Sequence, residues 1–253
     1  MGELAARVAR EKAAYDDGAT HRESSALQAR FHHVFKCPNS RRAEEHLDRA
    51  VAGWAKDKDI LDYGCYDGWM TPQYQKMAPA SITGLDISET GIAKARASFG
   101  DIAKFYAGDA HAMPFPDASF DLVVGRSILH HLDLEVALKE ICRVLRPSGK
   151  AVFVEPLRDN PGAKILRALT PRARTADEKP LTCADIQRAD ALFGSSEHFF
   201  FNLVSVPLAM ASSLTSLSPD NTLLHFADHI DRALAHTFVK YWMRQVVLVW
   251  HKA

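Results

Sequence analysis

The sequence predicts an α/β fold, a Rossmann-like doubly wound sheet with helices on both of its faces. Between about residues 58 and 155, short β-rich runs alternate with amphipathic helical stretches, which is typical of parallel strands joined by helical crossovers. Glycines and acidic residues follow directly after successive β-rich runs. Two further β-rich runs late in the chain would complete the sheet.

The first five β-rich runs are expected to be parallel strands, and the last two close the sheet. They cover residues 59–63, 81–86, 104–106, 120–124 and 150–154, then 197–204 and 244–250. About 39 residues separate the last two runs (244 minus 204, less one), which is too long for a hairpin loop. We therefore expect a helical insert at about 205–240.

Three stretches have the pattern of helices. Apolar residues share one stripe over 134–145, with Asp133 as the expected N-cap and Pro147 to Gly149 as the stop signal. Ser88 is expected to cap a second helix that runs to Phe99. A third helix is expected around 184–192.

Length and composition indicate one large globular domain that binds a small molecule. The chain has 253 residues, 47% hydrophobic and 25% charged. Lys plus Arg and Asp plus Glu number 31 each, so no net field would attract nucleic acid or an anionic membrane. No apolar run approaches the roughly 20 residues of a membrane span. We expect a cytoplasmic protein with a small organic substrate.

The cysteines indicate neither a metal site nor a redox site. Cys37, Cys65, Cys142 and Cys183 are widely separated, and no pair has the short spacing of either motif. We expect no bound metal and a reducing environment.

The residues that follow each strand carry the functional signal, because a ligand of a doubly wound sheet lies across the carboxyl ends of its strands. The first run continues into Asp62-Tyr63-Gly64-Cys65-Tyr66-Asp67-Gly68, where glycines permit a tight turn close to a ligand. Asp86 ends the second run, and its carboxylate can accept hydrogen bonds from both hydroxyls of a ribose. After the third run, Asp109 can accept from an adenine amino group while the N–H of Ala110 donates to the ring.

Each of these residues alone would also suit a turn or a helix cap, whereas their order is selective. The loop lacks the complete Gly-x-Gly-x-x-Gly turn that binds a pyrophosphate, which disfavours a nicotinamide cofactor. The set Asp-x-Gly-Cys-x-x-Gly, Leu-Asp-Ile-Ser, Gly-Asp-Ala, Phe-Asp-Leu-Val and Arg-Val-Leu-Arg-Pro-Ser-Gly resembles the class I S-adenosylmethionine-dependent methyltransferases, especially the branch acting on small molecules. The resemblance covers about residues 58 to 155.

This resemblance implies a seven-stranded mixed sheet whose last strand runs antiparallel between the fifth and sixth. It implies S-adenosyl-L-methionine as cofactor and S-adenosyl-L-homocysteine as product. Gly64 and its neighbours would approach the methionine part, Asp86 the ribose, Asp109 and Ala110 the adenine, and Gly125 to Ser127 the amino acid end. The implied cofactor-binding residues are Asp62, Gly64, Cys65, Tyr66, Gly68, Asp86, Ile87, Asp109, Ala110 and Arg126. Tyr66 departs from the family, which usually has glycine there.

His130 and His131 are both candidates for a general base, because they lie just beyond the fourth strand on the cofactor side of the sheet. Adjacent residues rarely both face one pocket, and a capping or packing histidine is the alternative for each. Glu155 ends the fifth strand, where it could orient such a base or bind a cationic acceptor. An ordinary surface carboxylate is the alternative.

The expected organisation is a single domain, with an N-terminal helical lid over residues 1–55, a cofactor-binding core over 56–155 and a substrate-side half over 156–253. Apolar residues in the late insert would suit a hydrophobic acceptor, although core packing or a dimer surface explains them equally well. We expect O-methylation rather than N- or C-methylation, in a monomer or homodimer. The alternative is a repurposed, non-catalytic member that keeps the fold as a binding scaffold.

Overall fold

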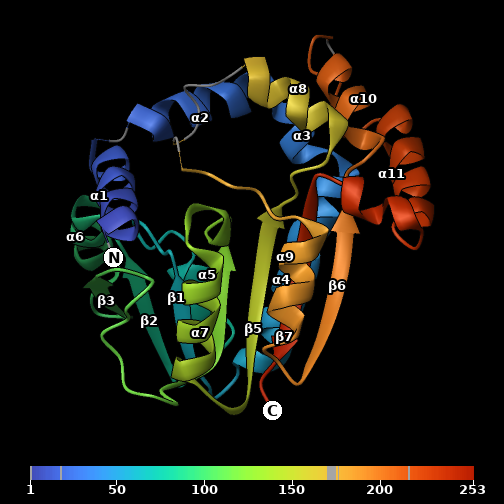
Figure 1. Ribbon diagram of the computed structural model, residues 1–253. Coiled ribbons are helices and arrows are strands. Elements are labelled where there is room, and N and C mark those ends of the chain that lie inside the picture. The colour runs from blue at the N-terminus through green and yellow to red at the C-terminus, as the bar shows by residue number, and fades with distance from the viewer. Residues whose placement is uncertain (1, 18, 170–174, 176, 216) are drawn as a thin grey trace.

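The computed structural model describes residues 2–17, 19–169, 175, 177–215 and 217–253. Its centre is a seven-stranded sheet in the order β3-β2-β1-β4-β5-β7-β6 (Figure 1). The strands are β1 Asp59–Tyr63, β2 Ser81–Asp86, β3 Lys104–Ala107, β4 Phe120–Arg126, β5 Leu145–Pro156, β6 Ser195–Phe201 and β7 Gln245–His251. β7 pairs antiparallel with both β5 and β6, and the pairs among β1 to β5 are parallel. The predicted mixed sheet is confirmed.

Helices precede the sheet, join its strands and follow it. Before β1 come α1 Gly2–Asp17, α2 Ala19–Arg30, α3 His32–Lys36 and α4 Pro38–Ala55. Between strands lie α5 Thr71–Gln75, α6 Glu89–Phe99, the 3-10 turn η1 Leu129–His131, α7 Leu134–Val144, α8 Pro161–Leu169 and α9 Cys183–Asp190. The late insert contains α10 Ser205–Ser212, α11 Thr222–Leu234 and the 3-10 turn η3 Phe238–Trp242, and its residue 216 lies outside the described residues.

Side chains alternate between the two faces of the sheet, so each face has its own core. Ile60 belongs to the core under α4, α5 and α6, whereas Leu61 and Tyr63 belong to the core under α7 and α9. The predicted N-caps are present: the Ser88 side chain accepts from the N–H of Gly91 at 3.0 Å, and that of Asp133 accepts from the N–H of Val136 at 3.3 Å.

Several predicted boundaries differ from the observed ones, and local contacts account for three of the differences. β6 ends at Phe201 rather than at residue 204, because Asn202 has a φ of +69° and the N–H groups of Leu203 and Val204 donate to Asp231 instead of to β7. β5 begins at Leu145, five residues before the predicted start, since the chain pairs with β4 as soon as α7 ends. α9 ends at Asp190, where a turn replaces the last predicted residues.

Helices from both ends of the chain lie over the carboxyl ends of the strands. Figure 1 shows α2, α8, α10 and α11 as an arch above the sheet, with α1 descending on one side beside α6. α10 contacts α3 and α11, which ties the late insert to the N-terminal helices. No helix within the described ranges is both long and apolar enough to cross a membrane.

Candidate functional site

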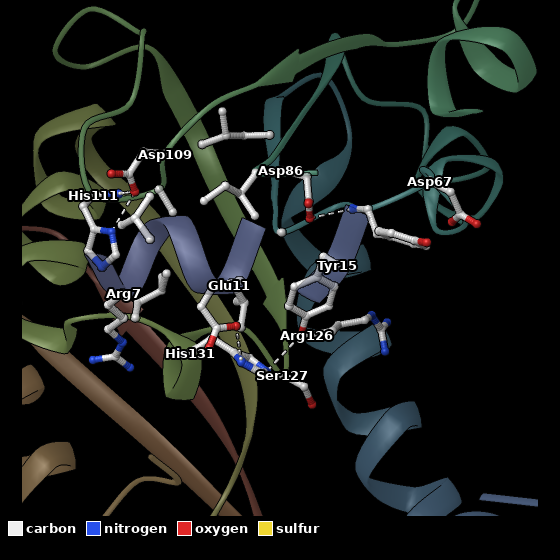
Figure 2. Close-up of a pocket in the computed structure, with 18 of the residues that line it drawn as sticks. Arg7, Glu11, Tyr15, Asp67, Asp86, Asp109, His111, Arg126, Ser127 and His131 are labelled. Atoms are coloured by element: carbon white, nitrogen blue, oxygen red, sulfur yellow. Dashed lines mark hydrogen bonds and ion pairs between the residues drawn. The ribbon is translucent and has the colours of Figure 1, made fainter. Parts of the chain in front are cut away.

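A cavity of about 520 Å³ lies at the carboxyl ends of β1, β2 and β4, with α1 as its outer wall (Figure 2). Predicted cofactor residues that line it are Gly64, Tyr66, Asp86, Ile87, Asp109, Ala110 and Arg126. Of the predicted catalytic residues, His131 lines it. Figure 2 shows Asp86 between Asp109 and Arg126, with Asp67 on the side of Arg126 and Arg7 on the side of Asp109.

The loop after β1 needs its first glycine. Gly64 has a φ of +81°, and a Cβ there would come within 2.8 Å of Ile128 Cγ1. Tyr66 also has a positive φ, of +46°, which costs a residue with a side chain about 1 kcal/mol or more. The Tyr66 ring packs against Gly91 of α6 and lies 6.5 Å from the Tyr15 ring of α1. Tyr66 therefore has the left-handed backbone that suits glycine, and its ring adds an aromatic contact toward α1.

Asp86 connects this loop to the start of α6. Its Oδ2 accepts from the N–H of Tyr66 at 2.9 Å, and its Oδ1 accepts from the N–H of Ser88 at 2.8 Å. Burial raises the pKa of Asp86, and these backbone hydrogen bonds oppose the rise. Each oxygen has a further lone pair, so the carboxylate can still accept hydroxyl groups from the cavity.

Asp109 is held by His111, which sequence analysis did not single out. Asp109 Oδ1 lies 2.7 Å from His111 Nδ1, and His111 Nε2 accepts from the N–H of Asp133 at 2.8 Å. Because Nε2 accepts a hydrogen bond, Nδ1 must carry the proton of the neutral ring. Burial tends to raise the pKa of Asp109, but the hydrogen bonds from His111 lower it overall. Asp109 is thus kept ionised and oriented.

Arg126 is tied to α4 by ion pairs with Glu44 and Asp48, and its guanidinium lies 5.8 Å from the centre of the Trp69 ring. Its Nε is buried without a hydrogen-bond partner. Other residues that line this cavity also have buried atoms without a hydrogen-bond partner. These atoms are Arg7 Nε, Asp67 Oδ1 and both carboxylate oxygens of Glu11. Among the described residues, five of nine such atoms therefore belong to residues that line one cavity.

The atoms without hydrogen-bond partners belong to two cationic and two anionic side chains, and such a set suits a ligand that carries both signs of charge. The amino acid end of S-adenosylmethionine is such a ligand, with a carboxylate, an ammonium and a sulfonium. Its nucleoside end suits the carboxylates of Asp86 and Asp109. The residues present therefore fit this cofactor.

Asp62, Cys65 and Gly68 lie behind the cavity wall rather than on it. Asp62 is buried, and burial raises the pKa of its carboxyl to about 7, while the nearby Arg126 opposes the rise. The Cys65 side chain packs toward Gly84, and Gly68 has a φ of +75° beneath Phe105. These three residues support the loop from below.

His130 and Glu155 also lie behind the wall, as a buried pair. Glu155 Oε1 accepts from the N–H groups of Ile128 and Leu129, each at 2.8 Å, and Oε2 lies 2.7 Å from His130 Nδ1. His130 Nε2 is 3.5 Å from Glu178. Burial would lower the pKa of His130, but the two carboxylates raise it to about 9. His130 is therefore a cation at neutral pH, and Glu155 is fully buried rather than a surface carboxylate.

His131 faces the cavity between two side chains of α1. Its Nε2 lies 3.1 Å from the Tyr15 hydroxyl, and its Nδ1 lies 3.2 Å from Glu11 Oε2 (Figure 2). Sequence analysis left both histidines open, and the structure separates them. In the part of the chain that is described, no three His, Cys, Asp or Glu side chains are grouped so that they could hold a metal ion.

Arg7, Glu11 and Tyr15 were missed by sequence analysis, although all three line the cavity. They are spaced four residues apart, so they share one face of α1. Large polar side chains at this spacing in an otherwise alanine-rich helix were the available signal. No local pattern indicates what that face of α1 contacts.

Comparisons with known proteins agree with this geometry. A family model described as a methyltransferase domain matches residues 61–153. The malonyl-[acyl-carrier protein] O-methyltransferase of Enterobacter lignolyticus is 31% identical over 200 residues, which cover 76% of this chain and 74% of that enzyme. An O-methyltransferase of Penicillium expansum is 36% identical over 52% of this chain. The match spans 49% of that enzyme and 32% of a sterol 24-C-methyltransferase of Gibberella zeae, so the chain spans about half or less of these relatives.

Solved structures share the fold. A chain in the complex of a Haloferax volcanii methyltransferase with its Trm112 activator superposes with a TM-score of 0.62 at 19% identity, covering 94% of this chain and 96% of that one. The geranyl diphosphate C-methyltransferase of Streptomyces coelicolor, solved with Mg²⁺, geranyl diphosphate and S-adenosyl-L-homocysteine, superposes with a TM-score of 0.58 at 13% identity, covering 84% and 77%.

Proposed function

Because this chain belongs to the class I S-adenosylmethionine-dependent methyltransferase family, we propose that it transfers a methyl group from S-adenosylmethionine to a hydroxyl group of a small organic molecule. The observation that carries the proposal is the order of charged groups along the cavity. Asp109, Asp86 and Arg126 follow one another as adenine, ribose and amino acid carboxylate do in the cofactor.

The cofactor residues would divide the ligand between them. Asp109 and the N–H of Ala110 would bind the adenine, Ile87 would pack on its face, and Asp86 would accept from the ribose hydroxyls. Arg126 would bind the carboxylate through its free Nε, and Asp67 would bind the ammonium. When bound, S-adenosylmethionine supplies a methyl group already activated by a sulfonium.

A hydroxyl acceptor is supported by His131. This imidazole lines the cavity, and the Tyr15 hydroxyl already lies within hydrogen-bond distance of its Nε2. Methyl transfer chiefly requires alignment of the acceptor with the methyl carbon, and a base near neutral pKa assists when the acceptor is an alcohol or phenol. His130 is unsuited to this role, because its charge is held by two carboxylates away from the cavity.

The acceptor side of the cavity favours a partly apolar molecule. Val8, Trp69, Ile128 and Leu132 line it together with the polar groups above. Relatives named as O-methyltransferases support oxygen as the acceptor atom, and relatives named as sterol C-methyltransferases support an apolar substrate.

Two measurements test this proposal. Titration calorimetry should show S-adenosyl-L-homocysteine binding in the micromolar range, and methyl-labelled S-adenosylmethionine should yield an extractable labelled product from a set of phenols and aliphatic alcohols. The Asp109→Asn variant, which removes the adenine-facing charge, should weaken binding and labelling together. Absence of cofactor binding would overturn the proposal. Binding with no turnover of any acceptor would favour the non-catalytic scaffold instead.

A further inference from the structure

We propose that Glu11 of α1 is the positioning residue of His131, so that the N-terminal helix, and not only the sheet, completes the active site. The inference rests on the proposed O-methyl transfer and deepens it. Figure 2 shows Glu11, His131 and Tyr15 converging at the cavity, with the two α1 side chains on opposite sides of the imidazole.

Glu11 is a buried carboxylate that has its charge directed into the site. The residue is 5% exposed, and neither carboxylate oxygen has a hydrogen-bond partner among the described residues. Its Oε2 lies 3.2 Å from His131 Nδ1. The two groups are at ion-pair distance, but they are not oriented as a hydrogen bond requires. Burying a carboxylate without hydrogen bonds costs free energy. The position of Glu11 beside an imidazole therefore indicates a functional role.

Glu11 and Tyr15 lie beside different ring nitrogens of His131, and together they favour one tautomer of the imidazole. A carboxylate at Nδ1 favours the tautomer with the proton on Nδ1, which leaves the lone pair on Nε2. Burial raises the pKa of Tyr15, so its phenol stays protonated and donates to Nε2 at 3.1 Å. The Tyr15 hydroxyl thus marks the position where an acceptor hydroxyl would hydrogen-bond to the base.

Glu155, the carboxylate expected from the sequence to orient a base, serves His130 instead. Its two oxygens are occupied by two backbone N–H groups and by His130 Nδ1. Glu11 is therefore the carboxylate that remains for His131.

The surrounding charges explain why His131 needs a carboxylate of its own, in addition to the two that pair with His130. The ring centre of His130, a cation at neutral pH, lies 4.2 Å from that of His131, and Arg7 lines the same cavity. The carboxylates of Glu155 and Glu178 pair with His130, and Thr175 Oγ1 lies 3.5 Å from His131 Nδ1. A protonated His131 would therefore sit beside another cation unless Glu11 offset it.

In the proposed step, the acceptor hydroxyl loses its proton to His131 Nε2 while its oxygen forms a bond to the methyl carbon. The electron pair of the broken carbon–sulfur bond remains on sulfur. Glu11 stabilises the imidazolium that forms, and His131 later returns the proton to water.

The test compares Glu11→Gln with Glu3→Gln, an exposed glutamate of the same helix. The glutamine keeps a hydrogen-bond acceptor but loses the charge. We expect Glu11→Gln to lower kcat by about tenfold to a hundredfold, because the imidazolium that forms loses its counter-charge. Glu11→Asp should restore part of the rate. Glu3→Gln should match the wild type in every respect.

A second readout does not depend on turnover. Nitrogen-15 NMR of the histidines, with S-adenosyl-L-homocysteine bound, should show His131 protonated on Nδ1 in the wild type and a smaller population of that tautomer in Glu11→Gln. Thermal unfolding should confirm that the variant is folded. If the histidine signals and the kcat of Glu11→Gln equal those of the wild type, the inference is wrong. If no acceptor is methylated but the tautomer population of His131 still changes, the proposed function fails and the assignment of Glu11 stands.

Discussion

Asp86 shows how one side chain can both hold a loop beside the cavity and line that cavity. Its carboxylate accepts from the backbone of Tyr66 on one oxygen and of Ser88 on the other. We predict that Asp86→Asn weakens S-adenosyl-L-homocysteine binding by about tenfold to a hundredfold, because the amide loses the charge and turns an NH₂ group toward one of its present donors.

Titration calorimetry measures this loss, with Asp101→Asn, an exposed acid after α6, as the matched control. A variant that binds as tightly as the wild type would show that the carboxylate serves only the loop.

The positions of the residues at the strand ends were predictable because they depend on local sequence. Asp86 ends β2 and Asp109 lies two residues after β3, and the sheet brings consecutive strand ends to one edge. Glu11 and Tyr15 were not predictable, since their partner His131 lies more than a hundred residues away and no local pattern encodes that contact. The separation of His130 from His131 depends likewise on Glu155 and Glu178, which only the fold brings near.

At the scale of elements, α1 is held over the cavity mainly by polar contacts. Asp16 accepts from Ser88 Oγ at 2.8 Å and from Thr90 Oγ1 at 3.2 Å, Lys12 pairs with Glu89, and Arg10 pairs with Asp177. Exposed pairs of this kind are each worth about 1 kcal/mol or less, so each of them alone adds little to the docking of α1. A sequence pattern based on apolar periodicity cannot predict such docking, although it predicted α6 and α7 with their caps.

We predict that Asp16→Ala loosens α1 without unfolding the sheet. Three hydrogen bonds to the first turn of α6 are lost, so amide protons of residues 2–17 should exchange at least several-fold faster while those of β1 and β4 are unchanged. Hydrogen exchange followed by mass spectrometry measures this, and Asp101→Ala serves as control. Equal protection of α1 in both proteins would mean that Asp16 does not hold the helix.

At the scale of the whole molecule, the direction of the last strand could not be read from its residues. β7 is apolar and buried on both faces, from Val246 to Trp250, and such a run fits parallel or antiparallel pairing equally. Only the family resemblance placed it antiparallel between β5 and β6. Trp250 then packs on Phe193, with 5.2 Å between ring centres, and its Nε1 donates to Asp190, which joins the last strand to α9.

At the scale of the whole molecule, two groups beneath the cavity should lower the free energy of unfolding as pH rises from about 4 to 9. Burial raises the pKa of Asp62 from 3.8 to about 7, so between about pH 4 and 7 the unfolded chain loses this proton while the folded chain keeps it. The raised pKa of His130, from 6.5 to about 9, contributes stability that is complete below about pH 6.5 and is lost as pH rises through 9. Both groups lower the free energy of unfolding toward alkaline pH.

We predict that Asp62→Asn is more stable than the wild type at pH 8, by about 2 to 4 kcal/mol, and equally stable near pH 4, because the amide fills the same space and never ionises. Urea unfolding at pH 4, 6 and 8 measures the difference. The decline due to His130 should persist in the variant above pH 8, which provides an internal control. A variant less stable than the wild type at pH 8 would show that the nearby Arg126 outweighs burial and keeps Asp62 ionised. Asp62 would then act as a charged group of the proposed cofactor site, rather than as a buried carboxyl whose ionisation lowers the stability of the fold.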